Sequence, residues 1–118
     1  MLSRAAFNSF CGSLPASHHV VQWGGADVWK VGAKVFAIAG WHADRDAYTF
    51  KVTPLAFEVL CASPGIRPAP YMASRGLKWV QVFDDPGLCD LSLKDHLRQS
   101  YDLVCAGLTR KVRKDLGL

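Results

Sequence analysis

The sequence predicts a single two-layer α+β domain in which helices pack on one face of an antiparallel sheet. The length of 118 residues suits one domain, spanning residues 1–118. Half of the residues are hydrophobic and a fifth are charged, which is typical of a globular chain. Short β-like segments with short links favour an antiparallel meander. The expected order is α-β-β-β-β-α-β-α, a fold with its helices grouped on the sheet.

The first element is a helix that Ser3 can cap. Gly12 and Pro15 close it. Its apolar positions recur at helical spacing and form one stripe: Ala6, Phe7, Phe10 and Leu14.

Four β-like segments follow the first helix. Gly24-Gly25 and Gly32-Ala33 are turn signals between the first three of them. We expect residues 40–46 to form a polar loop before the fourth. The expected strands are residues 19–23, 27–31, 34–39 and 47–52.

Thr53 and Pro54 begin a second helix, with Thr as N-cap and Pro at the first helical position. Ser63-Pro64-Gly65 ends it. Prolines stiffen the following segment, which we expect to be a loop. Residues 71–75 suit a short helical turn, and residues 77–83 alternate as a strand.

The last helix is the longest, and we expect Ser92 to cap it. Thr109 can cap a final basic turn. Tyr101, on the apolar side, and its neighbours Ser100 and Asp102 favour a structural role over a catalytic one. The apolar stripe recurs every three or four residues: Leu93, Leu97, Tyr101, Val104 and Leu108.

The net charge of +4 is concentrated near the C-terminal end of the sequence. A basic surplus favours anionic partners, because cations on one surface bind phosphates by releasing condensed counterions. Two alternatives remain: a solvated helix turn whose cations suit the helix dipole, and scattered solubilising charge. The candidate nucleic-acid-binding residues are Lys34, Lys51, Arg67, Arg75, Lys78, Arg110, Lys111, Arg113 and Lys114.

No catalytic or metal-binding constellation is evident in the sequence. The cysteines form no C-x-x-C pair and have no histidine at zinc-ligand spacing, so we expect free thiols in a reducing cytosol. Nucleophile, P-loop and dinucleotide motifs are absent. We therefore expect a cytoplasmic protein that is not an enzyme and has no cofactor, metal or membrane span. The four cysteines are Cys11, Cys61, Cys89 and Cys105.

Several short segments, in their shared order and spacing, resemble the YjbR/MmcQ family of small bacterial proteins. The resemblance covers nearly the whole chain. It rests on Leu14-Pro15, Val28-Trp29-Lys30-Val31, Lys34-Val35-Phe36-Ala37, Phe50-Lys51 with Pro54, Pro68-Ala69-Pro70-Tyr71, Trp79-Val80 and Ser100-Tyr101-Asp102-Leu103-Val104.

The resemblance implies a sheet of the "double wing" type, likened to a DNA-binding module. With the basic surplus, it leads us to expect a monomer that binds DNA weakly through a basic face. The alternative is a protein-interaction or chaperone-like module, in which Trp23, Trp29 and Trp41 line a patch or groove.

Overall fold

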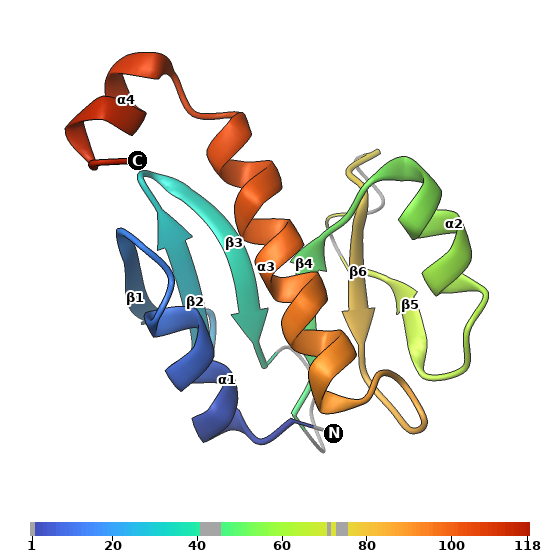
Figure 1. Ribbon diagram of the computed structural model, residues 1–118. Helices are drawn as coiled ribbons and strands as arrows, with labels where there is room; N and C mark the ends of the chain where they lie inside the picture. Colours follow the sequence, from blue (N-terminus) through green and yellow to red (C-terminus); the bar gives the residue numbers. More distant parts are fainter. Residues whose placement is uncertain (1, 41–45, 71, 73–75) are drawn as a thin grey trace.

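A six-stranded antiparallel sheet in the order β1-β2-β3-β4-β6-β5 organises the chain (Figure 1). The computed structural model describes residues 2–40, 46–70, 72 and 76–118. The elements are α1 (Arg4–Gly12), β1 (Ser17–Gln22), β2 (Ala26–Val31), β3 (Lys34–Ala39), β4 (Tyr48–Lys51), α2 (Pro54–Cys61), β5 (Ile66–Pro68), β6 (Trp79–Val82), α3 (Asp90–Ala106) and α4 (Arg110–Asp115).

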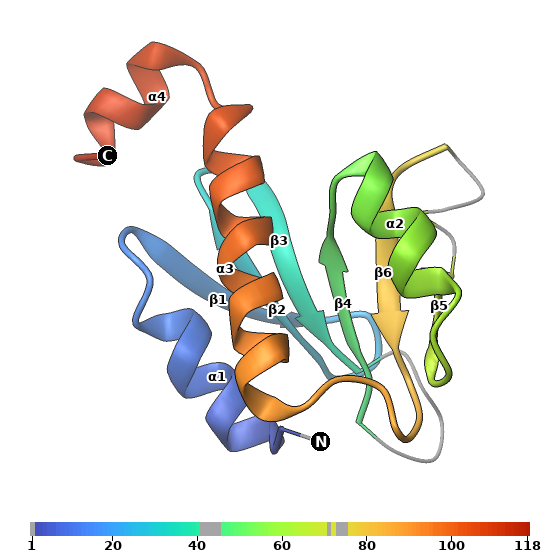
Figure 2. The same cartoon turned by 45° about the vertical axis from the view of Figure 1, so that its right-hand side comes forward.

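Helices α1, α2 and α3 cover one face of this sheet, and α3 crosses β3 and β4 (Figures 1 and 2). The main core lies between these layers. Ala37, Phe50 and Val80 stand side by side in the strand register and are fully buried under the helices. Leu97 and Tyr101 supply the covering face of α3. The two-layer α+β prediction is thus confirmed.

The local signals for helix starts are confirmed because each depends only on neighbouring residues. The hydroxyl groups of Ser3, Thr53 and Thr109 each accept a hydrogen bond from the backbone N–H three residues later. The Gly24-Gly25 turn also forms, with both glycines at positive φ.

Three boundaries differ from the prediction. The segment expected as a proline-stiffened loop contains the edge strand β5, where Pro68 is tolerated because an edge strand needs fewer N–H donors. The final basic turn is a separate helix, α4. Helix α3 begins before Ser92, with Cys89 as N-cap and Asp90 in the first turn, where an acidic side chain suits the helix dipole.

Candidate nucleic-acid interface

Three lysines, two at the ends of strands and one just before a strand, lie at one end of the sheet. Lys34 begins β3 and Lys51 ends the neighbouring antiparallel strand β4. Lys51 stands opposite Trp79 in β6, and the backbone N–H of Val52 donates to the carbonyl of Lys78 at 2.9 Å. Alternating strand directions therefore gather lysines that are far apart in the sequence.

Helix α4 extends this end of the molecule. It stands out beyond the sheet and the end of α3 in both ribbon views (Figures 1 and 2). Its apolar side is anchored on the β2–β3 turn, because a Cβ at Gly32 would lie 3.3 Å from Leu108 and 3.4 Å from Val112. The turn that precedes Lys34 thus contacts the base of α4.

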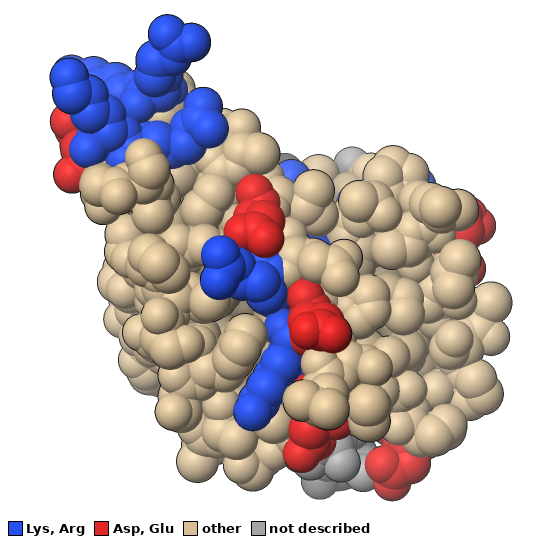
Figure 3. All heavy atoms as spheres, viewed as in Figure 1, with Lys and Arg blue, Asp and Glu red and all other residues tan. Residues whose placement is uncertain are grey.

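Four cations project from α4, and the space-filling view shows Lys and Arg side chains gathered over this helix (Figure 3). Together with the three strand-end lysines, they form what we call the basic end. No described carboxylate lies within 4.0 Å of any of these seven groups. The basic end consists of Lys34, Lys51, Lys78, Arg110, Lys111, Arg113 and Lys114.

The charge of the molecule is unevenly distributed. Seven cations and the carboxylate of Asp115 give the basic end a formal charge of +6. Since the whole chain carries +4, the remainder carries −2. An anionic polymer is therefore attracted to one end and repelled, weakly, by the rest.

Lys78 has a defined position although it is exposed. Its ammonium group lies 4.7 Å from the centroid of the Phe57 ring on α2. Such a cation–π contact orients the side chain without neutralising its charge. The lysine therefore remains available for a phosphate group.

Two of the nine candidate residues are not part of the basic end. Arg67 donates from Nε and Nη2 to the side-chain oxygen of buried Gln81, at 2.9 and 2.7 Å. Its guanidinium also lies 4.4 Å from the centroid of the Phe83 ring. Through these contacts Arg67 supports β5 against β6. Arg75 lies outside the described residues.

Ser100 connects the last helix to the strand end that carries Lys51. Its hydroxyl donates to the carbonyl of Phe36 at 2.6 Å and accepts from the backbone N–H of Lys51 at 2.9 Å. The paired register of β3 and β4 stops at Ala37 and Phe50, so Ser100 bridges the next position. The neighbouring Tyr101 donates its hydroxyl proton to the carbonyl of Pro15. The side chains of Ser100 and Tyr101 thus hold backbone groups of other segments in place.

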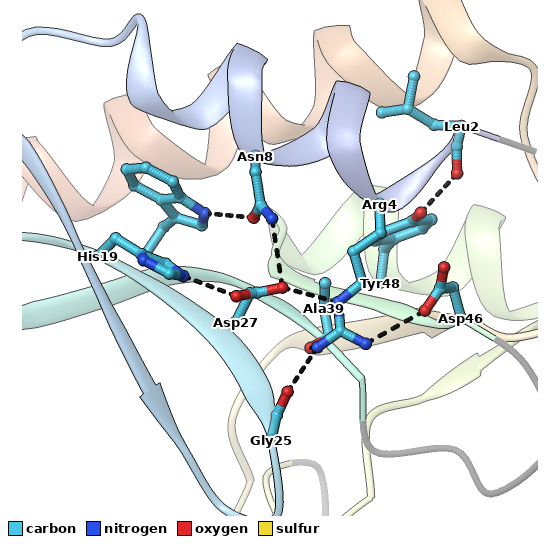
Figure 4. Close-up of polar contacts among 10 residues, drawn as sticks. Leu2, Arg4, Asn8, His19, Gly25, Asp27, Ala39, Asp46 and Tyr48 are labelled. Carbon is cyan, nitrogen blue, oxygen red and sulfur yellow. Dashed lines mark hydrogen bonds and ion pairs between the residues drawn. The ribbon is translucent and has the colours of Figure 1, made fainter.

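Sequence reasoning missed a polar network at the opposite end of the sheet, between α1 and the hairpin β1–β2 (Figure 4). Asp27 accepts hydrogen bonds from Arg4 at 2.7 Å, Asn8 at 3.2 Å and His19 at 2.7 Å. Asn8 in turn accepts from the indole N–H of Trp29 at 2.9 Å. The network fixes α1 on the sheet.

Arg4 has its donors engaged within this network. Besides Asp27, it contacts Asp46 at 3.2 Å and the carbonyls of Gly25 and Ala39 at 2.7 and 3.1 Å. Burial tends to raise the pKa of Asp27, but hydrogen bonds from Arg4, His19 and Asn8 outweigh it, so this pKa is lowered. These charges stabilise the fold and leave little capacity for a ligand.

The cysteines and the possible metal ligands were also located in the structure. All four cysteines are free; Cys11 is buried, and Cys89 is exposed with its sulfur 3.3 Å from the hydroxyl of Ser92. Within the described ranges, no three His, Cys, Asp or Glu residues are arranged to hold a metal ion. Nor does any helix in that part of the chain have the length and apolar character needed to cross a membrane.

Comparisons with known proteins identify the family and the fold of the chain. The YjbR family model matches residues 12–103. A crystal structure from Deinococcus radiodurans with a DUF419 domain is 31% identical, with a TM-score of 0.85, covering 100% of this chain and 90% of that one. A Pseudomonas syringae structure at 21% identity and TM-score 0.68 shares the fold, covering 86% of this chain and 98% of its own. The search of curated proteins gives no significant match.

Proposed function

We propose that this chain, which belongs to the YjbR family, binds the phosphate backbone of nucleic acid through its basic end. The supporting observation is a set of seven cations with no described carboxylate within 4.0 Å, on a molecule whose remainder is net negative. Each phosphate that a cation neutralises releases condensed counterions, which favours binding. Backbone contacts carry no sequence information, so the binding is non-specific and weak.

The protruding position of α4 supports this proposal. Because α4 stands clear of the sheet, its four cations can reach a phosphate backbone without steric conflict from the body (Figure 2). Lys34 follows the turn that contacts the base of the same helix, and Lys51 and Lys78 extend the basic end along the neighbouring strands β4 and β6. A duplex is thus contacted along a row of phosphates rather than at one point.

A fluorescence-anisotropy titration with random duplex DNA at two salt concentrations tests the proposal. We expect micromolar binding that weakens steeply with salt. If about five phosphates are contacted, the logarithm of the binding constant falls with that of the salt concentration with a slope of about −4.5. Absence of binding at low salt contradicts the proposal, as does binding that salt leaves unchanged.

A protein partner is the second candidate, and the outer face of α2 favours it. Leu55 and Val59 are 76% and 60% exposed and lie one helical turn apart. The tryptophan patch expected from the sequence does not support this candidate. Trp29 is buried against Gly12, and Trp41 lies outside the described residues. Trp23 is half exposed.

Affinity purification with wild-type protein and with Leu55→Glu/Val59→Glu tests this second candidate. A partner that the wild type retains and the variant loses, while both keep the same fold by circular dichroism, supports it. Identical retention by both proteins contradicts it.

A further inference from the structure

A cavity of about 310 Å³ lies within the basic end, between the ends of strands β3, β4 and β6 and the last turn of α3. The Ser100 hydroxyl takes the place of a direct backbone pair between Phe36 and Lys51. The residues that line the cavity and matter for its chemistry are Lys34, Val35, Lys51, Leu77, Trp79 and Val104.

The lining combines two kinds of surface. Val35, Leu77 and Trp79 provide an apolar wall, while Lys34 and Lys51 provide two basic side chains. Neither ammonium group has a described carboxylate within 4.0 Å. Two basic side chains beside an apolar wall suit a small molecule with an anionic group and an apolar body.

The volume restricts the ligand further. Small-molecule sites typically measure about 300–1,000 Å³, so this cavity is at the lower limit of the range. It can accept one nucleotide unit but not a stretch of duplex. A nucleotide also has the required chemistry, since its phosphate is anionic and the face of its base is apolar.

We propose that this cavity binds a single nucleotide with a terminal phosphate, held by Lys34 and Lys51, with its base against Leu77 and Trp79. The proposal deepens the phosphate-backbone function and rests on it for the source of the ligand. Two sources share this chemistry: a free nucleoside monophosphate and the 5′-phosphorylated end of a strand. Helix α4 contacts the duplex backbone, and the cavity receives the terminal unit.

The test is a titration of ¹⁵N-labelled protein with thymidine 5′-monophosphate, followed by NMR. We expect saturable shifts at Val35, Leu77 and the Trp79 indole, and no such saturation with thymidine or inorganic phosphate alone. Lys51→Met removes one ammonium group and should weaken binding at least about tenfold. Lys94→Met, on α3 outside the cavity, is the matched control and should bind as the wild type does.

A second variant separates the cavity from the basic end as a whole. Leu77 is half exposed, so Leu77→Trp fills the cavity while it leaves all seven cations and the buried core in place. We expect it to lose nucleotide binding and to keep the duplex affinity of the wild type. Nucleotide shifts that survive both Lys51→Met and Leu77→Trp overturn the proposal, as do identical shifts with inorganic phosphate.

Octanucleotides with a 5′-phosphate or a 5′-hydroxyl distinguish the two sources. Tighter binding of the phosphorylated strand, lost in Leu77→Trp, supports the strand end as ligand. Equal binding of the two strands, with thymidine monophosphate still bound, supports the free nucleotide. Duplex binding without any nucleotide binding overturns the cavity proposal alone, whereas nucleotide binding without duplex binding overturns the backbone proposal.

Discussion

The network around Asp27 and the basic end use the same kinds of side chain in opposite ways. Arg4 donates to two carboxylates and two carbonyls, and these contacts hold α1 against the sheet. The cations of α4 have no described carboxylate within 4.0 Å and stand clear of the body. The partners of a charged residue, rather than its type, therefore decide whether it supports the fold or remains available to a ligand.

The largest expected effect is on stability, from the network. Asp27→Ala removes the acceptor shared by Arg4, Asn8 and His19 and leaves their donors partly buried without it. We expect the free energy of unfolding in urea to fall by about 2–4 kcal/mol. DNA affinity at a temperature where the variant stays folded should not change.

The exposed pair Arg98–Asp102 provides the control for this prediction. Its atoms are 3.2 Å apart, but both side chains are more than half exposed. Asp102→Ala should therefore cost less than about 0.5 kcal/mol. Equal losses in the free energy of unfolding from Asp27→Ala and Asp102→Ala would show that the network stabilises the fold no more than an exposed ion pair does.

Ser100→Ala should have the next largest effect. It leaves the N–H of Lys51 and the carbonyl of Phe36 without their shared partner. Unfolding in urea should show a loss of about 1–3 kcal/mol. Ser9→Ala, an exposed position on α1, is the control and should be near neutral. A neutral Ser100→Ala would show that the bridge between β3 and β4 contributes little.

Arg67→Gln and Lys78→Gln test whether an engaged cation and an available cation behave differently. Arg67→Gln removes the hydrogen bonds to buried Gln81 and should cost about 1 kcal/mol in urea, with duplex affinity retained. Lys78→Gln should show the reverse, a small stability change and a salt slope reduced by about one. A loss of duplex affinity in Arg67→Gln but not in Lys78→Gln would show that Arg67 belongs to the interface.

The smallest expected effect is on the pH dependence of stability. Folding lowers the pKa of Asp27, so its carboxylate contributes stability above its unfolded pKa of about 4. That contribution is lost as the pH falls through the lower folded value. The free energy of unfolding in urea should therefore fall more steeply between about pH 4 and pH 2 for the wild type than for Asp27→Asn. Parallel curves would show that Asp27 does not carry this linkage.

The predictable part of this protein is the part encoded locally. Helix caps at Ser3, Thr53 and Thr109 depend on residues three positions apart, and the α4 cluster is contiguous in sequence. Strand β5 was missed because three residues ending at a proline give almost no periodic signal. Its existence depends on pairing with β6.

The interface itself was only partly accessible from the sequence. Lys34, Lys51 and Lys78 were identified as cations, but the strand register brings them together. The sequence predicts Arg67 on the same surface, because nothing nearby in the sequence reveals Gln81 as its partner. The network around Asp27 joins residues 8 to 23 positions apart, and no local pattern indicates such contacts.

The most direct test compares two charge-matched double variants in the same duplex-DNA titration. Arg110→Gln/Lys111→Gln removes two cations from α4, and Lys94→Gln/Arg98→Gln removes two from α3, outside the basic end. We expect the α4 variant to lose at least about tenfold in affinity and about two units of salt slope, and the α3 variant to bind nearly as the wild type does. Equal losses from the two variants would contradict this expectation, because net charge alone would then explain the binding.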